Sequence, residues 1–100
     1  MDILMNKEAM TRLQEELRQA PGKVVRLLKE DRGEWTFAID QAKPQDYRGF
    51  VGPVPVAVEP SAIGEEEEEG QLLFLWTSGG FTLGMRMAHD ACVVDMEIRE

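Results

Sequence analysis

The sequence has few cysteines, a shortage of basic residues and no long apolar run, and each shortage excludes a class of protein. Cys92 is the single cysteine among 100 residues, so the chain forms no internal disulfide and lacks the pattern of a small secreted scaffold. No apolar run approaches the roughly 18 residues of a membrane-spanning helix, and the first residues lack the basic leader of a signal peptide. We therefore expect a cytoplasmic protein without a membrane partner.

The charge balance argues against nucleic acid as a partner. Eleven Lys and Arg residues face nineteen Asp and Glu residues, which gives a formal charge of -8. Affinity for nucleic acid comes largely from Lys and Arg at the phosphates, so this balance is unfavourable. Much of the acidic excess lies in the run Glu65 to Glu69. Because such a block repels itself, we expect a solvated loop there rather than a cation site or a docking point for a basic partner.

An amphipathic helix is the first regular element that the sequence predicts. Asn6 is suited to cap it, and apolar residues recur at three- and four-residue spacing from Ala9 to Ala20. The Pro21-Gly22 pair stops it, because proline lacks a backbone donor and glycine turns easily.

Short strands are predicted for most of the remaining chain. Residues 23–29 and 34–40 favour an antiparallel hairpin, with Trp35, Phe37 and Ile39 on one buried face. Residues 50–58 favour another strand pair. Proline cannot donate to a ladder, so Pro53 and Pro55 place the Val54–Val58 stretch at a sheet edge or hairpin rim. Other expected elements are a helical turn at 60–64 capped by Ser61 and strands at 71–76 and 81–87.

This order of elements predicts a single α+β domain over residues 1–100. One N-terminal helix packs on small, mostly antiparallel β-sheets. Residues 88–100 are expected to form a loosely attached tail or a last strand.

The serial order of several segments is similar to that of the HesB-like domain, the fold of A-type iron-sulfur cluster carriers. The resemblance covers about residues 3–83. The segments that carry it are Asn6-Lys7-Glu8-Ala9, Gly22 to Leu27 with its arginine, Ala38-Ile39-Asp40, the loop with Asp46, Val54 to Pro60, the Ser61 turn, and Gly79-Gly80-Phe81-Thr82-Leu83. It implies the α+β fold above and a role linked to iron-sulfur cluster biogenesis.

The thiols on which that family depends are missing. The family has one cysteine after the second strand, where this chain reads Glu30-Asp31-Arg32-Gly33-Glu34, and a Cys-x-Cys pair near the C-terminus, where only Cys92 remains. A stable cluster normally takes about four soft sulfur ligands, shared across a dimer if necessary. One thiol per chain is too few, so we expect no cofactor.

These observations leave two functional hypotheses. The first is a non-enzymatic, cluster-free HesB-like protein that associates with a protein partner or a second copy through a sheet edge or the Val54–Val58 hairpin. The second is a divergent iron-sulfur or metal carrier that uses Cys92 and His89, at the spacing of one helical turn, across a dimer. A structural cysteine and a solvated histidine explain the same residues without chemistry. A thiol enzyme would need an orienting group and an oxyanion site, so we expect no catalytic residues.

Overall fold

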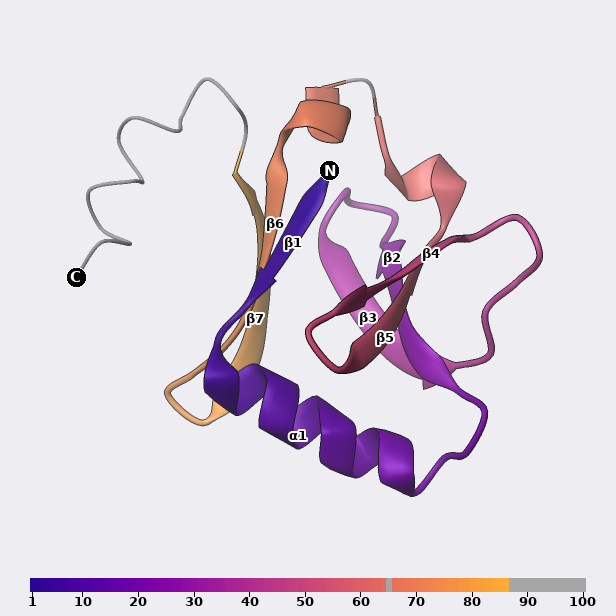
Figure 1. The fold of residues 1–100 in the computed structure, drawn as a ribbon. Coiled ribbons are helices and arrows are strands. Elements are labelled where there is room, and N and C mark those ends of the chain that lie inside the picture. Colours follow the sequence, from indigo (N-terminus) through magenta and orange to yellow (C-terminus); the bar gives the residue numbers. More distant parts are fainter. Residues whose placement is uncertain (65, 87–100) are drawn as a thin grey trace.

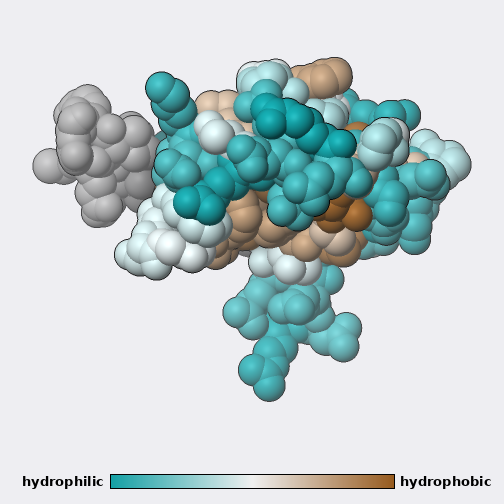
Figure 2. Space-filling view, turned by 90° about the horizontal axis from the view of Figure 1, so that it is seen from below, coloured by the Kyte–Doolittle hydropathy of each residue, from teal (hydrophilic) through white to brown (hydrophobic). Residues whose placement is uncertain are grey.

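The predicted helix and its cap are confirmed. In a computed structural model of the chain, which describes residues 1–64 and 66–86, α1 (Lys7–Arg18) begins directly after Asn6. The Asn6 side-chain oxygen accepts a hydrogen bond from the Ala9 backbone N–H at 3.0 Å. Ala9 and Leu13 are buried against the core. The surface seen from the α1 end of the molecule is mostly hydrophilic (Figure 2), as expected for the solvent-facing side of an amphipathic helix.

Strands and short 3-10 helices account for the other regular elements of the described residues, and together with α1 they confirm the α+β class (Figure 1). The strands are β1 (Asp2–Met5), β2 (Val24–Lys29), β3 (Trp35–Asp40), β4 (Tyr47–Val51), β5 (Val54–Val58), β6 (Gln71–Thr77) and β7 (Gly80–Arg86). The 3-10 helices are η1 (Pro60–Ala62) and η2 (Glu66–Glu69).

The larger sheet has the strand order β3-β2-β5-β4. Both predicted pairs, β2–β3 and β4–β5, are antiparallel hairpins, and β2 pairs with β5 in parallel. β5 therefore lies inside the sheet, and the prediction that its prolines hold it at an edge is wrong. The sheet accommodates them because Pro53 lies in the β4–β5 turn and the ladder with β2 begins only at Val56, one residue after Pro55.

The smaller sheet has the strand order β1-β6-β7. β6 and β7 correspond to the strands predicted at 71–76 and 81–87, and the structure pairs them as an antiparallel hairpin. β1 was not predicted: it pairs in parallel with β6, from Asp2 opposite Gln71 to Met5 opposite Phe74. Only four residues long and followed at once by the helix cap, it is too short to show a period of two in the sequence.

The core lies between the two sheets and the inner side of α1. Its largest fully buried side chains are Phe74, Leu13, Leu27, Leu72, Val25 and Val54. On one side, aromatic rings fill the seam between the sheets. The ring centre of Phe37 in β3 lies 5.2 Å from the ring centre of Phe81 in β7 and 4.9 Å from that of Phe74. The predicted buried face of β3 is confirmed for Trp35, while Phe37 and Ile39 are half-buried at this seam.

Two local predictions are wrong. η1 forms where a helical turn is expected, but Glu59 occupies its N-cap position without a side-chain bond, and Ser61 lies inside the turn. The glutamate run is not wholly solvated, because Glu67 in η2 is only 7% exposed. The Lys29 ammonium lies 2.5 Å from the Glu67 carboxylate. This ion pair offsets both the cost of burying the Glu67 charge and the repulsion from the neighbouring glutamates.

Candidate functional site

The predicted metal ligands Cys92 and His89 lie outside the described residues. The turn in which the resemblance places the family's first cysteine position, Glu30 to Glu34, joins β2 to β3 and is exposed. Over residues 1–64 and 66–86, no group of three or more His, Cys, Asp or Glu side chains is placed to hold a metal ion. The described residues that fit a ligand lie elsewhere, along the opening between the two sheets.

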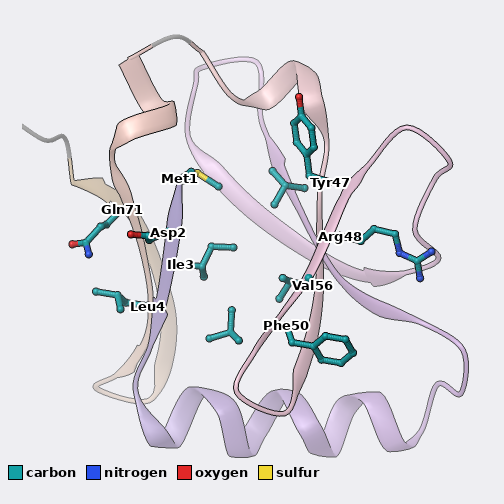
Figure 3. Close-up of a pocket in the computed structure, with 12 residues that line it drawn as sticks. Met1, Asp2, Ile3, Leu4, Tyr47, Arg48, Phe50, Val56 and Gln71 are labelled. Atoms are coloured by element: carbon teal, nitrogen blue, oxygen red, sulfur yellow. The ribbon is translucent and has the colours of Figure 1, made fainter.

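A groove of about 480 Å³ lies between β1, an edge strand of the smaller sheet, and β4, an edge strand of the larger one (Figure 3). Met1 and Ile3 point into it from one side, and Val56 points into it from the other. No histidine, cysteine, serine or threonine is among the residues that line it. This β1–β4 groove is therefore suited to hold apolar side chains.

The β1–β4 groove is hollow because β4 carries a glycine on its inner face. The register places Gly49 opposite Val56 and Tyr47 opposite Val58, and directly opposite residues share one face of a sheet. A Cβ atom added to Gly49 would meet no heavy atom within 4 Å. The absent side chain thus leaves open space in front of Val56. The opposite seam, between β3 and β7, is filled by aromatic rings.

β4 also offers a free edge with exposed aromatic side chains. Among the described residues it pairs with β5 alone, so its other side presents backbone donors and acceptors. Phe50 is 74% exposed and Tyr47 is 60% exposed. Figure 3 shows Phe50 pointing away from the β1–β4 groove, so apolar contact area continues around the strand. An edge strand with this character is a template for pairing with another segment of chain.

A second cavity, of about 360 Å³, adjoins the β1–β4 groove. It shares Met1, Tyr47 and Val58 with the groove and adds Ile63 and Glu68. The N-terminal ammonium of Met1 donates a hydrogen bond to the Glu68 backbone carbonyl at 2.6 Å, which ties the start of the chain to this wall. The β1–β4 groove therefore continues past the start of β1 toward η1 and η2.

A buried ion pair fixes the segment that leads into β4. Arg26 donates from Nε and Nη2 to the Asp46 carboxylate at 2.7 and 3.0 Å, and the Lys43 backbone N–H donates to it at 2.9 Å. The bond from Arg26 holds the pKa of Asp46 below its ordinary value despite burial, and it raises the pKa of Arg26. Because Asp46 directly precedes Tyr47, this pair sets where β4 begins. The family resemblance included both residues but did not predict their contact.

A second ion pair anchors the wall formed by η2. Lys29 Nζ donates to Glu67 Oε1 at 2.6 Å, and the Gly64 backbone N–H donates to the same oxygen at 2.8 Å. Burial raises the pKa of Glu67, but these two donors outweigh burial and the pKa lies below its ordinary value. The Trp35 indole N–H also lowers the pKa of Glu67. Among the described residues this buried nitrogen has no well-aligned hydrogen-bond acceptor. The pair holds Glu68 beside Met1.

A smaller pocket, of about 270 Å³, is lined by α1 residues and by Phe37, Trp76 and Phe81. The Arg12 guanidinium lies 3.8 Å from the Trp76 ring centre and pairs with Glu8 at 2.9 Å. A cation of the chain therefore already covers the aromatic face that this pocket would offer to a ligand. The β1–β4 groove has the larger volume.

The sequence led us to expect association through a sheet edge or the Val54–Val58 hairpin, but it did not single out residues of β4. It gave no role to Tyr47, Gly49 or Phe50. Four of the five β4 positions are exposed, so the strand lacks the alternation of apolar and polar residues that reveals a half-buried strand. The sequence signal that could have revealed this surface is the pair of aromatic residues, Tyr47 and Phe50, on either side of Gly49 in a segment that is too polar for the core.

Comparisons with known proteins support the fold. No protein-family profile and no curated protein matches the sequence. Among solved structures, the chain is similar to a crystal structure of IscA with the 2Fe–2S cluster, with 14% sequence identity and a TM-score of 0.52. The match covers 86% of this chain and 85% of that chain. It shows that this chain has the HesB-like fold that the order of its segments predicts. Within the described residues, no helix combines the length and apolar character needed to span a membrane.

Proposed function

We propose that this chain is a non-enzymatic association protein that binds an extended segment of a partner along β4 and works without a bound iron-sulfur cluster. The observation that carries the proposal is the free β4 edge, which has exposed Phe50 and Tyr47 on the strand and a hollow in front of Gly49. We further propose that the protein acts in the cytoplasm, in a process linked to iron-sulfur cluster biogenesis, because it shares its fold with IscA.

Strand addition uses each feature of this surface. The backbone of an extended peptide pairs with the free N–H and C=O groups of β4, which supplies affinity that is independent of sequence. Alternate side chains of the peptide then point into the β1–β4 groove, where the open space beside Gly49 accepts them. Apolar side chains are favoured because Met1, Ile3 and Val56 form the walls.

Charge adds a second criterion for the partner. The formal charge of -8 creates a negative potential around a chain of this size. Such a potential speeds the approach of basic segments and slows that of acidic ones. We therefore propose that the partner segment is apolar at alternate positions and carries Lys or Arg between them.

The thiol count supports a role without a cluster. The chain has one cysteine, and the turn at the family's first cysteine position is the exposed, acidic segment Glu30 to Glu34. Hard carboxylates in an exposed turn do not replace soft thiolates as cluster ligands. The residues of this chain therefore do not fit a cluster of the carrier type.

A glycine pair in the chain allows a sharp test of the binding site. Gly49→Leu fills the β1–β4 groove, whereas Gly84→Leu places the same side chain in open space on β7. A displayed library of random peptides would be panned on the wild-type protein, and the enriched peptides measured by titration against both variants. We expect alternating apolar and basic peptides whose affinity falls at least tenfold in Gly49→Leu and stays unchanged in Gly84→Leu. Equal binding to all three proteins would refute the site.

The second candidate is a divergent iron-sulfur or metal carrier that uses Cys92 and His89 across a dimer. The shared fold with IscA, whose crystal structure contains a 2Fe–2S cluster, is the observation that favours it. A twofold dimer would bring together two thiols and two imidazoles. Iron, zinc and copper analysis of the purified and the reconstituted protein tests this candidate, which is abandoned if no metal is bound in either sample.

A further inference from the structure

We infer that the chain binds a guanidinium group, as carried by an arginine side chain, in a small aromatic pocket beside α1. This Trp76 pocket has a volume of about 270 Å³ and is lined by Arg12, Glu15, Glu16, Phe37, Trp76 and Phe81. It shares no lining residue with the β1–β4 groove. The inference therefore does not depend on the function proposed for β4.

Three aromatic rings from three strands form the wall of the Trp76 pocket. Trp76 of β6 and Phe81 of β7 are directly opposite each other in the ladder, and their ring centres are 4.8 Å apart. Phe37 of β3 packs against Phe81 with a distance of 5.2 Å between ring centres. All three side chains are half-buried, so packing holds them in place while part of each ring faces solvent. The faces of such rings carry partial negative charge and attract cations.

Arg12 shows that the exposed ring face accepts a guanidinium group. Its Cζ atom lies 3.8 Å from the centre of the Trp76 ring, well within the cation–π range of about 6 Å. The planar guanidinium stacks on an aromatic face, which a compact ammonium does not do. Arg12 is otherwise held by Glu8, and these two side chains are 48% and 53% exposed. Exposed ion pairs are weakly held, so a ligand can displace Arg12 from the ring.

Two carboxylates give the Trp76 pocket an excess of negative charge. Glu15 and Glu16 line it from α1, and their side chains form no ion pair or hydrogen bond with another described residue. Arg12, which carries the single positive charge of the lining, is paired with Glu8 instead. A second cation is therefore favoured at this pocket and an anion is disfavoured.

The volume of the pocket limits the size of the ligand. Pockets that hold drug-sized molecules have volumes of about 300 to 1,000 Å³. The Trp76 pocket is smaller than this range and suits a single group of side-chain size. A guanidinium on a flexible stem meets the requirements of size, charge and stacking together.

Fluorine NMR of protein labelled with 5-fluorotryptophan measures this binding. The chain has two tryptophans, and Trp35, which is buried and does not line the pocket, serves as the internal reference. Trp76→Phe assigns the two resonances. We expect N-acetyl-arginine methylamide to shift the Trp76 resonance with half-saturation in the millimolar range, and its neutral citrulline analogue to cause no shift. No saturable shift, or equal binding of the citrulline or lysine analogue, would overturn the inference.

Matched variants test the contribution of charge at the pocket. Glu15→Gln/Glu16→Gln removes two charges from the lining, whereas Glu68→Gln/Glu69→Gln removes two exposed charges at the opposite end of the molecule (Figure 1). We expect the first variant to weaken arginine binding about threefold or more and the second to leave it unchanged. Equal effects of the two variants would contradict a local role for the carboxylates and overturn the inference.

The variant Arg12→Gln tests whether the chain's own cation competes with the ligand. Removing the competitor should tighten binding by about two- to fivefold. Weaker binding in Arg12→Gln would overturn the inference. Gly49→Leu, which changes the β1–β4 groove, should leave this titration unchanged.

Two further probes distinguish the sources of the guanidinium. The peptide Gly-Gly-Arg-Gly-Gly represents an arginine side chain of a partner protein, and methylguanidinium represents a free small compound. Tighter binding of the peptide assigns the pocket to a partner's arginine, whereas equal binding assigns it to a free guanidinium compound. Both results support recognition of the guanidinium group, and failure of both probes to bind would overturn it.

Discussion

Replacing Asp46 with alanine should destabilise the fold more than any surface change. The variant leaves the Arg26 guanidinium, whose side chain is 5% exposed, without the carboxylate that binds its Nε and Nη2 atoms. Removing one member of a buried ion pair typically costs about 3 to 5 kcal/mol. Glu59, 3.7 Å from Arg26 and itself partly exposed, compensates only a small part of this loss. A domain of this size has a free energy of unfolding of about 5 to 15 kcal/mol, so the loss is a large share.

Thermal unfolding followed by circular dichroism measures this effect. For a domain of up to 100 residues, 1 kcal/mol corresponds to about 4 to 8 °C, so we expect the Tm of Asp46→Ala to fall by roughly 15 to 30 °C. The double variant Arg26→Met/Asp46→Leu removes both charges and should regain most of the stability, because apolar residues often replace a buried ion pair at little cost. A single variant as stable as the wild type, or a double variant as unstable as the single one, would refute the reasoning.

Three further predictions concern stability. The pKa values of Asp46 and Glu67 are lower in the folded chain than in the unfolded chain. Both carboxylates therefore stabilise the fold fully above their unfolded-state pKa values of about 4, and this stabilisation is lost as the pH falls through their folded-state pKa values. Urea denaturation at pH 7 and pH 3 should show this loss, which should be smaller in Asp46→Ala. Asn6→Ala removes the helix cap and two hydrogen bonds to the Trp76 backbone, and should cost about 2 kcal/mol in the same assay. Asn6→Asp keeps the accepting oxygen and should cost less; equal costs would contradict the role of that oxygen. Gly49→Leu should raise the free energy of unfolding by about 0.5 to 1 kcal/mol, because glycine inside a strand is destabilising and the new side chain has open space. A lower free energy of unfolding in this variant would show that the groove is not hollow.

The sequence predicted the elements whose signals are local. The cap at Asn6 and the stop at Pro21-Gly22 bound α1, and the turn at Asp31-Arg32-Gly33 closes the β2–β3 hairpin. The β6–β7 hairpin follows from the same kind of signal. Each depends on residues that are neighbours in the chain, where spacing and turn chemistry decide the structure.

Features that depend on distant contacts were missed. β1 is a strand because it pairs with β6, about seventy residues away in the sequence. β5 lies inside its sheet because β2 pairs with it in parallel, and Glu67 is buried because Lys29 reaches it from β2. The β1–β4 groove was missed for the same reason, since its walls come from strands that no local pattern brings together.

We propose above that this chain acts by association and holds no iron-sulfur cluster. The most direct test is the iron and sulfide content of the protein, purified anaerobically from iron-supplemented cells and then reconstituted with both ions. We predict far less than one iron per chain, no visible cluster absorbance, and the same result for Cys92→Ala. Stoichiometric iron and sulfide with a brown colour that disappears in Cys92→Ala would contradict the account.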